Sequence, residues 1–114
     1  MFIIQDKRII KSIDELIANI GKNVIISGKI SDIVWQHTIQ LSEDYQYYYY
    51  FDLDDGNQII IYTKNKIDEN KLKGKQIYVN GTVIQVMGLS KSYKKDERET
   101  YIEYHLNVDK ILIK

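Results

Sequence analysis

The chain lacks cysteine and proline entirely, and it has only two histidines, His37 and His105. Without cysteine, disulfides and thiolate metal sites are excluded. The two histidines lie far apart in the sequence and lack the spacing of a metal motif, so we expect a satisfied or solvent-facing role for each and no metal or other cofactor. The sequence also shows no glycine-rich phosphate loop and no nucleophile with a recognisable base. These absences argue against an enzyme.

The chain also has no formal net charge, because 16 basic residues balance 16 acidic ones. This balance disfavours strong nonspecific binding of a polyanion by the whole surface. No apolar run approaches the ~20 residues that span a bilayer, and the N-terminus does not resemble a signal peptide. We therefore expect a cytoplasmic protein with no membrane partner. The length of 114 residues suits one domain with one core.

The start of the chain predicts a short helix. Ser12 and Glu15 form a capping-box pattern, and apolar residues then recur at helical spacing. Gly21 fits a helix stop, which places the helix at about residues 12–20.

The remainder reads as strands separated by turns and polar loops. Alternation of apolar and polar residues predicts five strands: about 24–30, 46–53, 58–63, 77–87 and one from Tyr101 onward with a bulge near Val108 and Asp109. Residues 64–75 can hold one or two helical turns. Gly28 and Gly81 lie inside strands, where a chain bends or another backbone approaches closely. Antiparallel strands with such glycines favour a small barrel, which removes exposed sheet edges.

Three stretches carry a family likeness: GKNVIISGKI, YYFDLDDGNQIIIYT and LKGKQIYVNGTV. In this order and spacing the chain resembles the oligonucleotide/oligosaccharide-binding (OB) fold, in its anticodon-binding and single-stranded-DNA-binding branch. The likeness covers about residues 21–113. It implies an all-β fold with short helices: a five-stranded antiparallel Greek-key barrel with an N-terminal helix and a short helix between the third and fourth strands. We divide the chain into an N-terminal extension and helix, residues 1–20, and the barrel, residues 21–114.

Residues 47–50 are four consecutive tyrosines, which an extended strand distributes over both of its faces. The resemblance sets the phase, with Phe51 and Leu53 pointing into the barrel. A tight turn at residues 55–57 would then set Tyr50 opposite Tyr62. The residues expected inside are Tyr47, Tyr49, Phe51, Leu53, Ile59 and Ile61. The residues expected in one outer, solvent-facing patch are Tyr48, Tyr50, Ile60 and Tyr62. Cross-strand packing of the rings is the alternative to ligand stacking.

Basic residues and a tryptophan complete the candidate site. Lys64 follows the third strand, and the loop between the last two strands carries Lys91, Tyr93, Lys94, Lys95 and Arg98. Trp35 serves as a ligand platform or as a plug under the barrel, and we favour the plug. Five acids lie between residues 43 and 55, and acids repel phosphate. Asp54 and Asp55 precede Gly56 in a turn pattern, whereas Glu43 and Asp44 weaken the case for the outer part of the first loop.

We therefore predict a single-stranded nucleic-acid-binding module with little sequence preference, acting as an accessory in DNA replication or repair or in RNA metabolism. DNA is favoured over RNA as the ligand, although no residue pattern separates the two. Two other partners stay open. The tyrosine face can dock on a larger replication, repair or RNA-processing protein, or it can bury itself in a homodimer.

Overall fold

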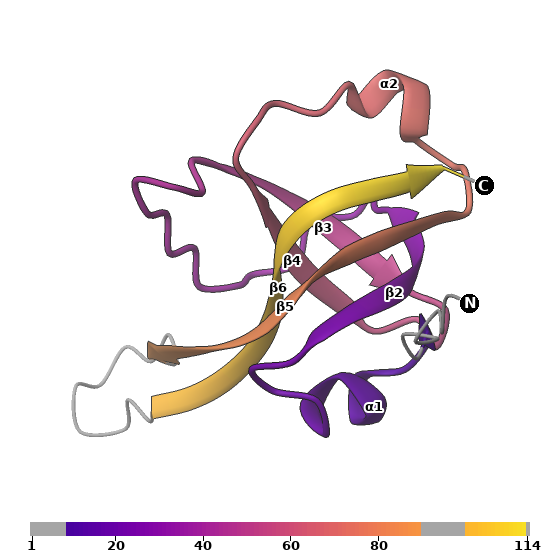
Figure 1. Cartoon of the computed structure of the whole chain (residues 1–114). Coiled ribbons are helices and arrows are strands. Elements are labelled where there is room, and N and C mark those ends of the chain that lie inside the picture. Colours follow the sequence, from indigo (N-terminus) through magenta and orange to yellow (C-terminus); the bar gives the residue numbers. More distant parts are fainter. Residues whose placement is uncertain (1–8, 90–99, 114) are drawn as a thin grey trace, which may run out of the picture.

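The computed structural model of this chain describes residues 9–89 and 100–113, which form six strands and two short helices (Figure 1). In chain order these elements are β1 (Ile9–Ile10), α1 (Ile13–Ile17), β2 (Asn23–Ile30), β3 (Tyr47–Leu53), β4 (Gln58–Thr63), α2 (Glu69–Leu72), β5 (Ile77–Leu89) and β6 (Thr100–Ile113). The predicted fold class is confirmed, and the short β1, which pairs parallel with β2, is an addition to it.

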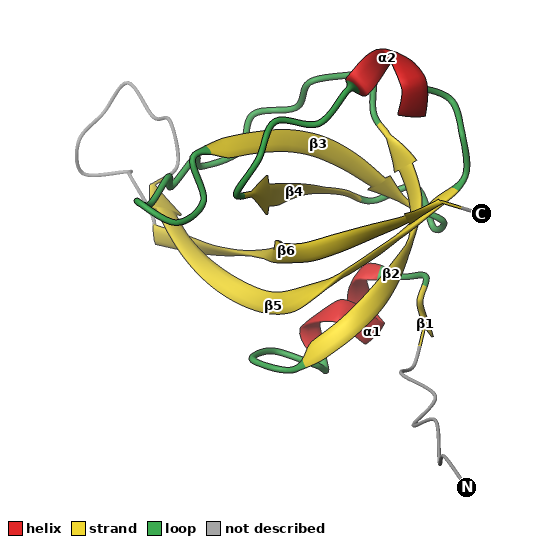
Figure 2. Ribbon diagram, turned by 45° about the horizontal axis from the view of Figure 1, so that its top comes forward, coloured by secondary structure: helices red, strands yellow, loops and turns green. Residues whose placement is uncertain are grey.

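Five strands close into a barrel in the order β2-β3-β4-β6-β5, and β5 pairs back with β2 (Figure 2). Within the described residues, every pairing in this barrel is antiparallel except that of β4 with β6. The chain between these two strands passes through α2 and β5, and a connection of that length permits a parallel pair. Helices α1 and α2 lie on opposite sides of the barrel in both views.

Helix α1 is shorter than its sequence pattern predicts. Ser12 caps it as expected, because its Oγ accepts a hydrogen bond from the Glu15 backbone N–H at 3.2 Å. The helix ends early at Ala18, and the Asn19 side chain donates to the Glu15 carbonyl oxygen at 2.7 Å. This side chain satisfies a terminal carbonyl group that has no partner further along the helix.

Gly28 marks the point where β2 changes neighbours. It pairs with Leu53 of β3 on one side and with Ile77 of β5 on the other. A Cβ atom at this position would lie 2.0 Å from the Asp52 carbonyl oxygen and 2.6 Å from the Phe51 ring. Only glycine permits this close approach, as its place in the strand predicts.

The second internal glycine, Gly81, lies beside a bulge. Asn80 pairs with Lys110 and Gly81 pairs with Val108, so Asp109 is the extra residue in β6. A Cβ atom on Gly81 would lie 2.2 Å from the Asn107 carbonyl oxygen. The bulge falls where the sequence predicted it.

The pairing of β3 with β4 differs from the predicted register by two residues. Tyr48 pairs with Tyr62 and Tyr50 with Ile60, whereas we expected Tyr50 opposite Tyr62. The turn lies one position earlier than predicted, at residues 54–56, since Leu53 N–H donates to the Asn57 carbonyl oxygen at 2.9 Å. An even shift leaves each side chain on its predicted face.

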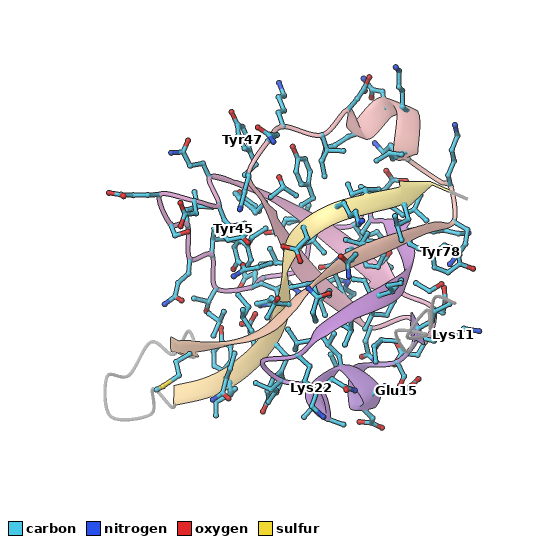
Figure 3. The ribbon with its side chains drawn as sticks, in the orientation of Figure 1. Lys11, Glu15, Lys22, Tyr45, Tyr47 and Tyr78 are labelled. Carbon is cyan, nitrogen blue, oxygen red and sulfur yellow. The ribbon has the colours of Figure 1, made fainter. Side chains whose placement is uncertain are left out.

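The barrel interior holds the side chains assigned to it by strand alternation. Tyr49, Phe51, Leu53, Ile59 and Ile61 are all buried in the core. Tyr47 is the exception to this prediction, because it remains 40% exposed. It begins β3, and Figure 3 labels it above Tyr45, which precedes the strand.

Candidate nucleic-acid interface

The candidate site is the outer face of β3 and β4. Strand alternation places Tyr48, Tyr50 and Asp52 of β3 on this face, beside Tyr62, Ile60 and Gln58 of β4. The face is only partly open to solvent: Tyr48 is 41% exposed and Tyr50 is half-buried, whereas Ile60 and Tyr62 are fully buried. The prediction that Ile60 and Tyr62 face solvent is therefore wrong.

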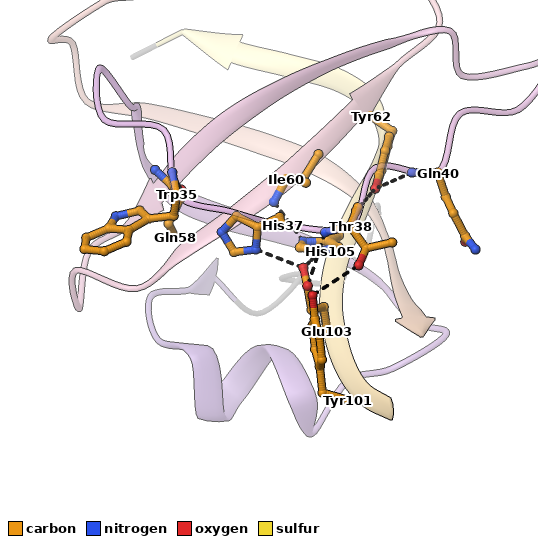
Figure 4. Close-up of polar contacts among 10 residues, drawn as sticks. All are labelled: Trp35, His37, Thr38, Gln40, Gln58, Ile60, Tyr62, Tyr101, Glu103 and His105. Atoms are coloured by element: carbon orange, nitrogen blue, oxygen red, sulfur yellow. Dashed lines mark hydrogen bonds and ion pairs between the residues drawn. The ribbon is translucent and has the colours of Figure 1, made fainter. Parts of the chain in front are cut away.

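These two residues are buried because residues 33–40, which we call the strap, run across β4 (Figure 4). Tyr62 fixes the strap through its hydroxyl group, which donates to the Thr38 carbonyl oxygen and accepts from the Gln40 N–H, both at 3.3 Å. Gln58 fixes the other end, because its Oε1 accepts from the Trp35 N–H at 3.1 Å and its Nε2 donates to the Ile33 carbonyl oxygen. Side chains of β4 thus satisfy backbone groups of the strap.

Glu103 of β6 holds the middle of the strap. Its Oε1 lies 2.9 Å from His37 Nδ1, and its Oε2 accepts from the Thr38 N–H at 3.2 Å. Oε1 also lies 2.7 Å from Nε2 of His105, which is on the same strand. Burial alone would raise the pKa of Glu103, but the hydrogen bonds from His37, His105 and Thr38 outweigh it, and the net pKa is lowered.

The proton positions in this cluster follow from one backbone amide. The Ile60 N–H donates to Nδ1 of the buried His105 at 2.8 Å. The neutral His105 ring must then carry its proton on Nε2, which donates to Glu103. Burial lowers the pKa of His105 to about 4, so the ring is neutral at pH 7. Glu103 is an acceptor for both histidines, and a neutral His37 therefore carries its proton on Nδ1.

His37, Glu103 and His105 offer ligand atoms that all lie within 4.8 Å of one another, a separation that suits a metal ion. The hydrogen bonds do not fit one. A metal on His105 Nε2 would move the ring proton to Nδ1, where the Ile60 N–H already points at 2.8 Å. The donor arrangement therefore describes a hydrogen-bonded relay rather than a set of metal ligands.

Aromatic rings continue from β3 onto the strap. The ring centroids of Tyr48 and Tyr50 are 6.0 Å apart, and those of Tyr50 and His37 are 5.9 Å apart. Trp35 and His37 then line one surface pocket. Tyr48, Tyr50, His37 and Trp35 thus form a row of rings across the face, which we call the ring row. Trp35 is 61% exposed, so the prediction that it plugs the barrel is wrong.

Tyr50 and Tyr62 on this face are neutral phenols. Burial raises the pKa of Tyr50, and the neighbouring Tyr48 and Glu103 raise it further. Burial is also the main cause of the raised pKa of Tyr62. A neutral hydroxyl group can donate and accept hydrogen bonds, which the contacts of Tyr62 with the strap require.

Charge around the ring row is mixed. Lys64 follows β4, and its Nζ lies 5.5 Å from the ring centroid of Tyr45, just before β3. Asp55 is engaged in turn chemistry, as its sequence context predicts, since it accepts from Asn57 N–H and from Ile13 N–H. Asp52 remains on the outer face beside Gln58. The other predicted cationic and aromatic site residues, Lys91, Tyr93, Lys94, Lys95 and Arg98, lie outside the described residues.

Sequence reasoning missed the relay of His37, Glu103 and His105. Glu103 and His105 are two residues apart on a strand, so alternation alone would place them on one face. Nothing in the sequence brings His37 to them, because 66 positions separate it from Glu103.

Comparison of the chain with models of protein families, with curated proteins and with solved structures gave no significant match. Across residues 9–89 and 100–113, neither helix has the length and apolar character needed to cross a bilayer.

Proposed function

We propose that this protein is an OB-type module that binds single-stranded nucleic acid along the ring row. The observation that carries the proposal is the row itself: Tyr48, Tyr50, His37 and Trp35 follow one another across a single face, and the rings at its two ends are the most exposed. Unpaired bases expose flat π-faces, and stacking on an aromatic side chain contributes ~1–3 kcal/mol per base. A duplex hides those faces.

The strand order supports the OB-type assignment. A closed five-stranded barrel with its short helix between β4 and β5 is consistent with that fold. The fold by itself does not identify a ligand, since barrels of this type serve many functions. The assignment to nucleic acid therefore depends on the ring row and not on the barrel.

Electrostatics favour a modest affinity. Lys64 stands beside Tyr45 near one end of the row, where it can meet a phosphate group. Asp52 lies on the same face and repels phosphate. Within the described part of the chain Asp52 offsets the charge of Lys64, so affinity should come chiefly from stacking, with a shallow dependence on salt.

Titration of a fluorescently labelled dT oligomer at two salt concentrations tests the proposal. We expect saturable binding that weakens moderately as salt rises, and much weaker binding of a duplex of the same length. Equal affinity for duplex and single strand would contradict stacking, even though nucleic-acid binding itself survived. Absence of binding to both dT and rU oligomers at low salt would contradict the proposal as a whole.

A second candidate function is docking onto a protein partner. It is favoured by the exposed apolar residues that precede Trp35, since Ile33 is 63% and Val34 is 68% exposed. Contiguous exposed apolar side chains are typical of interaction surfaces. In that case an Ile33→Ser, Val34→Ser double variant would lose the partner or dissociate a homodimer, as measured by sedimentation, while affinity for oligonucleotides would not change.

A further inference from the structure

One end of the ring row borders a small surface pocket. Trp35, His37, Gly56, Asn57 and Gln58 line it, and its volume is about 360 Å³. Figure 4 shows His37 between Trp35 and His105, with one edge toward Glu103 and the other toward Trp35 and Gln58. The exposed indole ring of Trp35 thus forms one side of the pocket, and an edge of the His37 ring forms another.

The edge of His37 that faces away from Glu103 carries an unpaired nitrogen. Its Nδ1 is engaged with Glu103 at 2.9 Å, while its Nε2 is buried and has no hydrogen-bond partner among residues 9–89 and 100–113. The relay from Ile60 through His105 and Glu103 puts the proton of a neutral His37 on Nδ1. In the neutral ring Nε2 is therefore a hydrogen-bond acceptor without a donor from the described part of the chain. Buried acceptors in native proteins are normally paired, so the partner of this one comes from outside those residues, and an N–H group of a ligand can be that partner.

We propose that Nε2 of His37 accepts a hydrogen bond from the exocyclic amino group of a nucleobase that stacks on Trp35. This inference rests on the proposed function and adds a base preference at one position of an otherwise tolerant interface. The ligand class is an amino-bearing base, such as cytosine or adenine. Thymine and uracil present carbonyl oxygens on either side of their single N–H group, and the lone pair of Nε2 repels those oxygens.

Because Nε2 is buried, a base reaches it only when a side chain beside the pocket moves, and we infer that the indole of Trp35 is that side chain. Trp35 is 61% exposed, so few contacts hold its ring in place. Its backbone is fixed, because the Trp35 N–H donates to Gln58 Oε1. A rotation of the side chain would widen the pocket beside His37 while the strap stays in position. Glu103 and His105 act here as positioning residues, since they fix the proton on the far side of the His37 ring.

The test compares a labelled dC oligomer with the same oligomer built from N4,N4-dimethylcytosine, which lacks the amino N–H. Wild-type protein should bind the dimethyl oligomer about 5- to 10-fold more weakly, because one hydrogen bond at a buried acceptor is lost. His37→Phe keeps a ring in the row but removes the acceptor, and it should bind the two oligomers about equally. Each result is a ratio measured on one protein, so a general loss of affinity in the variant cancels.

Every outcome bears on the inference. Failure of the wild type to bind either oligomer would refute the proposed function itself. Equal binding of both oligomers by the wild type would refute this inference and leave stacking intact. A penalty that persists in His37→Phe would identify a steric effect of the methyl groups, and it would overturn the inference too.

Two further comparisons complete the design. If His37→Phe does not fold by circular dichroism, the wild type is tested with dC against dT oligomers, and equal affinity for these two would contradict the inference. Free deoxycytidine, titrated as a competitor, distinguishes a strand from a mononucleoside as the source of the base. We expect it to compete only weakly, and an affinity equal to that of the oligomer would overturn the assignment of the pocket to a nucleic-acid strand.

Discussion

Tyr47 and Tyr48 are neighbours in β3, are exposed to almost the same extent, 40% and 41%, and point to opposite faces of the strand. Tyr48 belongs to the ring row and Tyr47 does not. The pair therefore provides a variant and a matched control within one dipeptide.

Tyr48→Ala should weaken binding of a dT oligomer by ~1–3 kcal/mol, a factor of about 5–150, because a stacking surface is removed. Tyr47→Ala should change affinity by less than about twofold, since its ring lies off the row. Fluorescence anisotropy at constant salt measures both variants. Equal losses in the two would show that the outer face of β3 is not the binding surface.

Tyr62 makes its contribution through stability and not through stacking. Tyr62→Ala should lower the free energy of unfolding by ~3–5 kcal/mol, because it leaves a large cavity under the strap. Tyr62→Phe should cost only ~1–2 kcal/mol, for the two hydrogen bonds to Thr38 and Gln40. Urea denaturation gives both values, and amide hydrogen exchange at Gln40 should speed up in Tyr62→Phe. Unchanged exchange there would mean that the hydroxyl group does not hold the strap.

Gly28→Ala should be among the most destabilising small changes in the barrel. The new Cβ atom would meet the Asp52 carbonyl oxygen at 2.0 Å, so β2 and β3 must separate. We expect a loss of about 3 kcal/mol or more. Gly21→Ala is the control, because its φ of +78° strains alanine but nothing lies within 4 Å of the added atom. It should cost ~1–2 kcal/mol. Thermal or urea unfolding that ranks the two in the opposite order would disprove the close approach at Gly28.

Acid should destabilise the protein through His105. Its pKa falls from an ordinary value of 6.5 to about 4 in the folded protein, so the unfolded chain binds a proton that the folded chain rejects between these two pH values. Stability from this group is fully present above about pH 6.5 and is lost as the pH falls to about 4, by about 3 kcal/mol in total. Glu103, with its lowered pKa, removes further stability as the pH falls below its ordinary 4.5.

His105→Asn tests this pH dependence. Its amide oxygen can still accept from the Ile60 N–H, but the side chain does not titrate. The variant should lose little stability between pH 6.5 and pH 4 relative to its own value at pH 7, measured by urea denaturation at each pH. A pH profile identical to that of the wild type would assign the acid sensitivity to other groups.

Lys64 should contribute to the salt dependence of binding. Lys64→Ala should reduce the slope of log affinity against log salt by about 0.7, the value for one phosphate contact on a single strand. Lys73→Ala removes the same charge from a residue that is paired with Asp32 at 2.8 Å, so its slope should stay close to that of the wild type. Identical slopes for all three proteins would place the phosphate contacts elsewhere.

Local pattern was sufficient to predict most of the fold. Alternation gave the five barrel strands and the buried set from Tyr49 to Ile61, because period two is a property of any strand with one face in a core. Gly28, Gly81 and the bulge at Asp109 were also recognisable, since glycine inside a strand usually marks a bend, a bulge or the close approach of another backbone. The register of β3 against β4 was not predicted, because it depends on which residues form the turn, and the turn lies one position earlier than expected.

The site was predicted only in part, and the cause is the strap. Alternation assigns Tyr62 and Ile60 to the outer face correctly, but it cannot tell whether another segment covers that face. A loop of irregular residues has no period, so its path depends on distant partners: Glu103 for His37 and Thr38, Tyr62 for Gln40, Gln58 for Trp35.

The sequence by itself determined which side chains lie on each face of each strand, because covalent geometry alternates them whatever the rest of the chain does. It also determined where the barrel bends, at residues without a Cβ atom. Only the tertiary structure decided which outward residues meet water and which protons His37 and His105 carry. Those properties arise from hydrogen bonds between groups up to 66 positions apart, and such bonds form only when closure of the barrel brings the strap onto β4 and β6.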